Sequence, residues 1–157
     1  MDFKDSLSVP ILRNAYKQHL RKKAISVREN YLKLPFPKAN VAVIELYLKD
    51  KNDVIEVGAT SRAKSPSPIP LAKSMGGQFE PIVDSYSGRL MDTDAEYKAL
   101  SAIADTLDNF YSRSVEGTLC LYTERQPCES CLGVIEQFKE KFHNIEIEVF
   151  WDEPYPP

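Results

Sequence analysis

Apolar side chains recur at helical spacing in three parts of the chain. From Pro10 to about residue 32 they alternate with Arg and Lys, which predicts a long basic amphipathic helix that Ser26 could interrupt. A second helix is expected to start at about Asp94, and a third in the segment that opens with Pro127. The last two helices each keep their apolar residues on one face: Tyr97, Leu100, Ile103, Leu107 and Phe110 in one, and Leu132, Ile135, Phe138 and Phe142 in the other.

Four shorter segments have the pattern of β-strands. Residues 41–48 form a largely apolar run, which is typical of a strand buried on most of both faces. Residues 54–57 follow after a polar turn, so these two strands are expected to pair as a hairpin. Residues 118–123 and 145–151 predict two further strands, and the second begins with the alternation of a half-exposed strand.

The predicted order is helix, strand, strand, helix, strand, helix, strand. A helix that joins two strands implies a parallel, right-handed crossover, whereas the first two strands are antiparallel. Residues 60–92 interrupt the pattern with several prolines and a Gly-Gly pair, and a loop this long is usually functional or mobile. The sequence therefore predicts an α/β fold in a single domain, residues 1–157, with a mixed four- to five-stranded sheet flanked by helices.

Composition and charge exclude some classes of protein. The chain has 157 residues and no run of about 18 apolar residues, so one domain and no membrane-spanning helix are expected. Residues 1–10 carry charges and no apolar stretch, so no signal peptide is expected. The net charge of −3 argues against a generically basic nucleic-acid coat protein.

The charge is divided unevenly along the chain. Residues 1–79 contain 14 Lys and Arg against 7 Asp and Glu, and residues 80–157 contain 6 against 16. Two interpretations stay open at this point. The two halves could form differently charged faces of one solvated domain, or the basic half could bind a polyanion.

Three cysteines exclude a disulfide framework and leave metal or redox chemistry. Cys128 and Cys131 follow Pro127 at a predicted helix start, where free N–H groups and the helix dipole stabilise thiolates. Two thiolates on one turn can bind a zinc ion, but the same pair could be a redox dithiol, half of a structural zinc site, or two inert buried cysteines. Cys120 lies in the middle of a predicted strand and is expected in the core.

A second helix start carries carboxylates. Glu96 is expected on the inward face of its helix, where a carboxylate is unusual unless it is used. The alternative is a capping box, in which Thr93 caps the helix and Glu96 reaches back to it. If the two helix starts meet, Asp94, Cys128 and Cys131 could bind zinc and leave a fourth position open for water, with Glu96 placed to move protons.

These motifs resemble the cytidine deaminase superfamily. The resemblance rests on Asp94-Ala95-Glu96 at a helix start, followed after about thirty residues by Pro-Cys-x-x-Cys, and on the order of the elements. It covers about residues 40–151, and residues 94–98, 119–131 and 135–138 look like the deaminase domains at the C-terminal ends of bacterial polymorphic toxins. One departure is Asp94, because most of the superfamily has His or Cys there. An anionic oxygen ligand should weaken Lewis acidity and place more demand on Glu96 and on burial of the site.

The resemblance implies a three-layer cytidine-deaminase-like fold and a zinc-dependent hydrolytic deaminase. It implies zinc ligands Asp94, Cys128 and Cys131, and Glu96 as the catalytic residue that moves protons. The implied substrate is cytosine, converted to uracil in single-stranded nucleic acid, DNA in preference to RNA. Residues expected near such a substrate, each of which could instead be an ordinary loop or core residue, are Asn40, Phe36, Tyr86, Ala95, Pro127 and Trp151, with Phe79 as a further candidate for stacking.

The same resemblance implies a biological setting. A toxin deaminase domain is secreted as part of a larger protein, acts as a mutagen in the cytoplasm of a competing target cell, and is inhibited by a cognate immunity protein; no membrane partner is expected. Three other functions remain open: a deaminase of free nucleosides or nucleotides, a non-enzymatic zinc-binding module, and a thiol oxidoreductase that uses Cys128 and Cys131.

Overall fold

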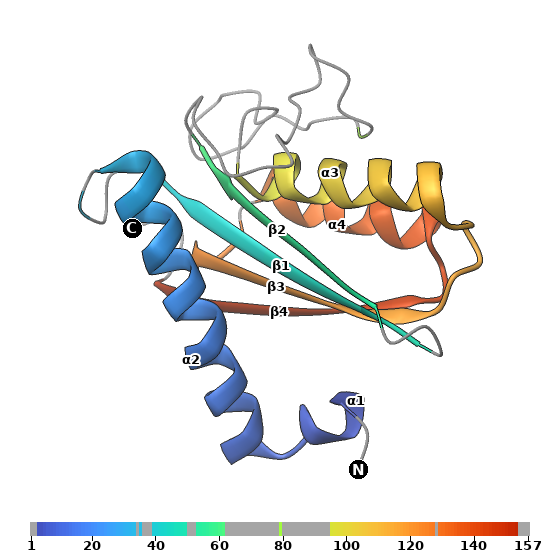
Figure 1. The fold of residues 1–157 in the computed structure, drawn as a ribbon, viewed down its shortest axis with the longest axis horizontal. Helices are drawn as coiled ribbons and strands as arrows, with labels where there is room; N and C mark the ends of the chain where they lie inside the picture. The colour runs from blue at the N-terminus through green and yellow to red at the C-terminus, as the bar shows by residue number, and fades with distance from the viewer. Residues whose placement is uncertain are drawn as a thin grey trace.

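A computed structural model describes residues 3–33, 35, 39–49, 53–61, 79, 95–127 and 129–153. Within them the chain forms a four-stranded sheet in the order β2-β1-β3-β4 (Figure 1). Strand β1 (Val41–Leu48) pairs antiparallel with β2 (Val54–Thr60) and with β3 (Gly117–Arg125). Strand β3 pairs parallel with β4 (Ile145–Glu153). The predicted hairpin and the predicted parallel crossover are both confirmed.

Helices cover both faces of the sheet. Helices α3 (Ala95–Phe110) and α4 (Glu129–Lys141) lie side by side on one face, and α2 (Pro10–Val27) crosses the other (Figure 1). The α-helical pattern of α2 ends at Val27 and continues as the π-helical turn η1 (Arg28–Leu32), which confirms an interruption near Ser26. A short helix α1 (Phe3–Ser6) precedes α2 and was not predicted, because four residues are too few to show periodicity. No described helix is both long and apolar enough to span a membrane.

The sheet separates two hydrophobic cores, because alternate side chains of each strand point to opposite faces. The larger core lies under α3 and α4 and contains Ile44 and Leu121 from the strands and Phe138 and Phe142 from α4. The smaller core lies under α2 and contains Val43, Cys120 and Phe150, which confirms Cys120 as a core residue. The architecture is the α/β three-layer arrangement expected for a cytidine-deaminase-like fold.

Polar residues form a row across the face of the sheet that α2 covers. Glu56, Glu45, Cys120 and Glu148 occupy matching register positions on the four strands. Helix α2 presents basic residues to this row and to neighbouring carboxylates. The ion pairs are Arg13–Glu148 at 2.8 Å, Lys17–Asp152 at 3.0 Å, Arg21–Asp152 at 3.7 Å, Lys23–Glu56 at 2.5 Å and Lys23–Glu45.

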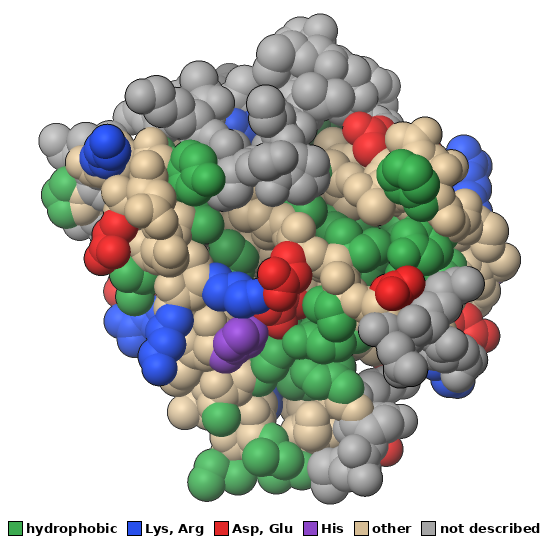
Figure 2. Space-filling view, in the orientation of Figure 1, with side chains coloured by type: hydrophobic (Ala, Val, Ile, Leu, Met, Phe, Trp, Pro, Cys, Tyr) green, Lys and Arg blue, Asp and Glu red, His purple; other side chains and the backbone are tan. Residues whose placement is uncertain are grey.

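These pairs change the interpretation of the uneven charge. Arg13 and Lys17 of α2 pair with carboxylates of the acidic half, whereas Lys23 pairs with two carboxylates of the basic half. Basic and acidic groups lie directly against one another near the centre of this face (Figure 2). Part of the contrast between the basic and the acidic half is therefore internal to the fold. Polyanion binding by the basic half stays a prediction.

Candidate functional site

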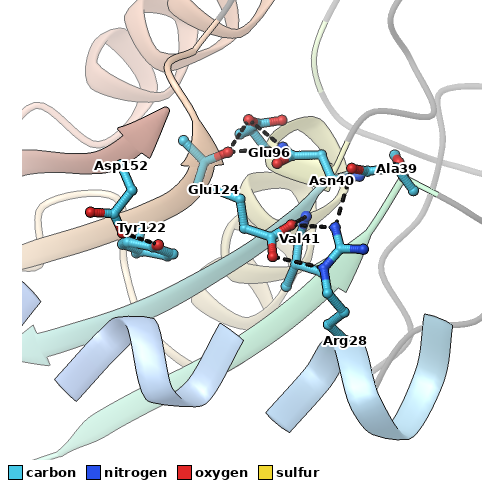
Figure 3. A network of polar contacts seen from close by, with 10 residues as sticks. Arg28, Ala39, Asn40, Val41, Glu96, Tyr122, Glu124 and Asp152 are labelled. Carbon is cyan, nitrogen blue, oxygen red and sulfur yellow. Dashed lines mark hydrogen bonds and ion pairs between the residues drawn. The ribbon is translucent and has the colours of Figure 1, made fainter. Parts of the chain in front are cut away.

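Glu96 lies in the first turn of α3 and is 2% exposed, so it points inward as its helical position predicts. Two donors hold the same carboxylate oxygen (Figure 3). The Thr123 hydroxyl donates to Glu96 Oε1 at 2.6 Å, and the Asn40 side-chain amide donates to the same oxygen at 2.9 Å. Charge-assisted hydrogen bonds of this kind are stronger than neutral ones and fix the orientation of the carboxylate.

Strand geometry explains why Asn40 and Thr123 meet there. Asn40 immediately precedes β1, and Ala42, two residues later, is paired with Thr123 of β3. Since side chains two residues apart share a face, both Asn40 and Thr123 point to the face covered by α3. The Asn40 amide also donates to Thr123 Oγ1 at 2.8 Å. Asn40 Oδ1 is buried and has no hydrogen-bond partner among the described residues.

The backbone of Asn40 is held as firmly as its side chain. Its N–H donates to the Ser61 hydroxyl at 2.9 Å, and its carbonyl accepts from the Ser61 N–H at 2.9 Å. The preceding residue, Ala39, has a left-handed backbone with a φ of 61°. Such a conformation is costly for alanine and persists only where the surroundings hold it.

A buried ion pair lies on the opposite face of the sheet from Glu96 (Figure 3). Arg28 Nε donates to Glu124 Oε2 at 2.8 Å, and Arg28 Nη2 donates to Glu124 Oε1 at 2.6 Å. The two side chains are 9% and 10% exposed. Glu124 follows Thr123 in β3, so the side chains of these two residues point to opposite faces of the sheet.

The predicted zinc ligands can be followed only in part. Cys131 is 2% exposed in the first turn of α4, which starts a few residues after β3 ends, so it lies at the same end of the sheet as Glu96. A helix N-terminus provides the N–H groups and the dipole that stabilise a thiolate, which a zinc ligand requires. Asp94 and Cys128 lie outside the described residues. The residues that are described contain no cluster of three or more metal-binding side chains.

The other predicted contacts divide into three groups. Ala95 and Pro127 are buried next to the two helix starts. Trp151 is 40% exposed and is paired in register with Thr123, which places it on the face of the sheet that carries Glu96. Phe36 and Tyr86 lie outside the described part of the chain. Phe79 is 3% exposed and packs on Phe138 at 6.1 Å between ring centroids, so it is a core residue and does not stack on a base.

Several residues that support the site were not singled out from the sequence. The apolar face of residues 119–123 could have identified Thr123, because Leu119 and Leu121 share its face and lead directly to it. No comparable pattern marks Arg28, Ser61 or Glu124. Their partners are separated in sequence by 21 residues for Ser61 and Asn40, and by 96 for Arg28 and Glu124. Only the tertiary structure brings such residues together.

Comparison with known proteins matches part of the chain to a protein family. A family model named Toxin-deaminase, described as "The BURPS668_1122 family of deaminases", matches residues 78–153. The matched segment contains α3, β3, α4 and β4, and with them Asp94, Glu96, Cys128 and Cys131. No curated protein matches the chain.

Proposed function

This chain belongs to the toxin-deaminase family, and from that premise we propose that it converts cytosine to uracil in single-stranded nucleic acid, DNA in preference to RNA. The family supports hydrolytic deamination in general. The observation that carries the proposal is the buried Glu96, whose Oε1 accepts hydrogen bonds from Thr123 and Asn40. A carboxylate that is buried and oriented by two donors is suited to proton transfer at one fixed place.

The proposed reaction adds water to C4 of cytosine and releases ammonia. Glu96 takes one proton from the attacking water and passes it to the ring nitrogen. It then takes the proton of the hydroxyl group now on C4 and delivers it to the departing amine, so that ammonia leaves as the C4 carbonyl forms. Thr123 and Asn40 hold Glu96 Oε1 throughout, so the carboxylate need not reorient between these transfers. Burial excludes bulk water from the transfers, which strengthens each electrostatic interaction.

We assign Asp94, Cys128 and Cys131 as the zinc ligands. The family typically uses zinc. When bound, zinc supplies a Lewis acid that lowers the pKa of the attacking water. The buried position of Cys131 at the start of α4 suits a thiolate ligand, and its place near the end of β3 puts it at the same sheet edge as Glu96.

Zinc content tests this assignment without an activity assay. We expect a single zinc ion per purified chain, lost in Cys128→Ser and in Cys131→Ser because a site with two protein ligands binds zinc far more weakly. Cys120→Ser is the matched control, since Cys120 is buried in the other core and should leave the zinc content unchanged. A zinc-free protein with a reversible Cys128–Cys131 disulfide would contradict the assignment and favour a thiol oxidoreductase.

Trp151 is proposed to stack on the target base or its neighbour. It is 40% exposed, and its register partner Thr123 donates a hydrogen bond to Glu96, which supports a contact between Trp151 and a base bound near Glu96. Stacking on an aromatic ring contributes roughly 1–3 kcal/mol per base. Trp151→Ala should therefore raise KM about tenfold and change kcat less, in steady-state assays on a cytosine oligonucleotide.

Phe110→Ala is the control for that substitution. Phe110 is a 78% exposed aromatic residue at the far end of α3 from Glu96. Its removal should leave KM unchanged. Equal effects of the two substitutions would remove Trp151 from the binding site.

The remaining substrate-binding candidates are proposed in the same way. Asn40 Oδ1 is a buried acceptor without a partner among the described residues, so it can receive a hydrogen bond from an N–H or O–H of the substrate. Ala95 and Pro127 are proposed to line the base pocket. Ala95 is the first residue of α3, and Pro127 lies just before α4. Phe36 and Tyr86 are proposed as further stacking residues from outside the described part of the chain.

Deamination assays on matched substrates test the function. Single-stranded DNA and RNA oligonucleotides with one cytosine, the same oligonucleotides with one adenine, and free cytidine should be compared with the wild-type protein. The proposal expects uracil in DNA at the highest rate and slower conversion in RNA. Turnover of free cytidine alone would favour a nucleoside deaminase, and turnover of adenine alone would overturn the choice of base.

Family membership also supports a biological proposal. The chain would act as the toxic domain of a larger secreted protein in the cytoplasm of a competing cell, where uracil in DNA is mutagenic. A cognate immunity protein would bind it in the producing cell. Co-expression of such a protein should restore the growth of cells that make the domain, whereas cells that make the Glu96→Gln form should need no protection.

A further inference from the structure

The two residues that flank Asn40 are held by the two partners of one buried ion pair. Arg28 Nη2 donates to the Ala39 carbonyl at 3.2 Å, and Glu124 Oε1 accepts from the Val41 N–H at 2.9 Å. Arg28 and Glu124 also pair with each other through two hydrogen bonds (Figure 3). The pair thus contacts the backbone immediately before and immediately after Asn40.

The same pair is connected to the site through β3. Glu124 directly follows Thr123, and Thr123 and Asn40 both donate to Glu96 Oε1. Arg28 reaches this position from the start of the π-helical turn η1, where the regular pattern of α2 changes. π-helical turns are frequent at functional sites because they re-aim a side chain. Arg28 lies outside the segment matched by the family model.

Stability alone does not account for this arrangement. A buried ion pair gains little over two well-packed apolar side chains, because removing both charges from water is costly. Its geometric effect is larger: a guanidinium and a carboxylate joined by two parallel hydrogen bonds are fixed in distance and angle. Ala39, in its left-handed conformation, also needs surroundings that hold it.

We propose that Arg28 and Glu124 form a positioning pair that holds Asn40 in place against Glu96. The inference rests on the proposed function, in which Asn40 and Glu96 take part. Neither Arg28 nor Glu124 touches the substrate; both act through the backbone on either side of Asn40.

A double-mutant cycle on catalytic efficiency tests the proposal. Arg28→Met should lower kcat/KM about tenfold, or about 1.4 kcal/mol. In the Asn40→Ala background the same substitution should lower kcat/KM less than about twofold, since the side chain through which Arg28 acts is already gone. An equal loss in both backgrounds would overturn the proposal.

Arg13→Met is the matched control. Arg13 lies on α2, which continues into the turn that carries Arg28, and it pairs with Glu148 at 2.8 Å. Among the described residues, that pair has no contact with the residues around Asn40. It should leave kcat/KM within about twofold of the wild-type value. A loss equal to that of Arg28→Met would show that any weakening of α2 has the same effect, and would overturn the proposal.

Arg28→Lys keeps the test decisive if Arg28→Met does not fold. Lysine retains the positive charge next to Glu124, but it cannot make the two-pronged pairing and also reach the Ala39 carbonyl. It should fold and lower kcat/KM about fivefold or more. Wild-type efficiency in Arg28→Lys would overturn the proposal.

The NMR signals of the Asn40 side-chain amide separate this proposal from the proposed function. Both the Glu96 and the Thr123 contacts use this amide, so its signals should shift in Arg28→Lys and stay unchanged in Arg13→Met. If the wild-type protein deaminates no substrate but the signals respond in this way, the proposed function has failed and the positioning role stands. If the signals do not respond, the positioning role has failed whatever the activity.

Discussion

Replacing Glu96 with Gln is expected to lower kcat by a factor of about 10²–10⁴. The glutamine carbonyl can still accept hydrogen bonds from Thr123 and Asn40, so the side chain should keep its position. It cannot carry a proton at neutral pH, and the proposed reaction needs two such transfers, one from water to the ring nitrogen and one from the adduct's hydroxyl to the leaving amine. Single-turnover deamination of a cytosine oligonucleotide measures the loss directly.

Two further measurements separate a catalytic loss from a structural one. The zinc content and the thermal unfolding temperature of Glu96→Gln should match those of the wild type, because size and hydrogen-bond acceptance are preserved. Glu116→Gln is a control at a 55% exposed position and should keep full activity. A Glu96→Gln protein that retains more than about a tenth of the wild-type kcat would rule out Glu96 as the proton carrier.

Acid should destabilise the fold through Glu45, a carboxylate that is 2% exposed in the middle of β1. Burial by itself raises the pKa of this carboxyl, but hydrogen bonds from Lys23, Tyr16, Tyr47 and His19 outweigh burial and lower the pKa to about 2. Tyr16 and Tyr47 donate to Oε1 at 2.5 and 2.8 Å, and His19 Nε2 lies 2.9 Å from Oε2.

The groups around Glu45 come from every element packed against it. Lys23, Tyr16 and His19 belong to α2, Glu56 faces it from β2, and Cys120 faces it from β3. Burial and the neighbouring carboxylates raise the pKa of the Cys120 thiol to about 12, so this thiol stays neutral over the range of interest.

A carboxyl whose pKa falls from an ordinary value of 4.5 to about 2 on folding stabilises the protein above pH 4.5. That contribution, about 3 kcal/mol, is lost as the pH falls through 4.5 towards 2, because the unfolded chain then binds the proton first. Urea unfolding of the wild type between pH 7 and pH 2 should therefore show a falling free energy of unfolding, beyond the fall seen in Glu45→Gln.

Glu45→Gln should also be less stable than the wild type at pH 7, by roughly 3–5 kcal/mol, because it leaves Lys23 beside a neutral amide in a buried network. Glu56→Gln is the matched control. Glu56 is 59% exposed and shares the Lys23 partner, so its replacement should cost at most about 1 kcal/mol. If Glu45→Gln and the wild type lose stability in parallel below pH 4.5, Glu45 is not the group responsible.

Local pattern was sufficient to predict most of the secondary structure. The apolar run of residues 41–48 is the strand β1, buried along nearly its whole length. The helical stripe from Tyr97 to Leu107 is buried in α3, whereas Phe110, its last predicted member, is exposed. These predictions succeeded because side chains return to the same face every two residues in a strand and about every 3.6 residues in a helix. The apolar positions of the buried face are therefore close together in the sequence. The partners of α2 could not be found in this way, because ion pairs such as Arg13–Glu148 join residues 135 apart.

The sequence predicted only some residues of the candidate site. Glu96 faces inward, as its place on the helix required, and Asn40 lies beside it. The capping-box alternative for Glu96 involves Thr93, which lies outside the described residues. The sequence did not reveal two contacts near Glu96. These are the hydrogen bond from the Thr123 hydroxyl to Glu96 and the ion pair between Arg28 and Glu124 next to Asn40.

The sequence by itself determined the class of fold, the match of residues 78–153 to the toxin-deaminase family and the residues proposed to carry the chemistry, because periodicity and the Asp-x-Glu and Pro-Cys-x-x-Cys motifs are local properties of the chain. Only the tertiary structure decided which groups hold those residues. Sheet register brings Thr123 opposite Trp151 and near Asn40, and the crossing of α2 brings Arg28 to Glu124. Hydrogen bonds and ion pairs act over a few ångströms in space regardless of separation in sequence, so folding has to place both partners before either contact exists.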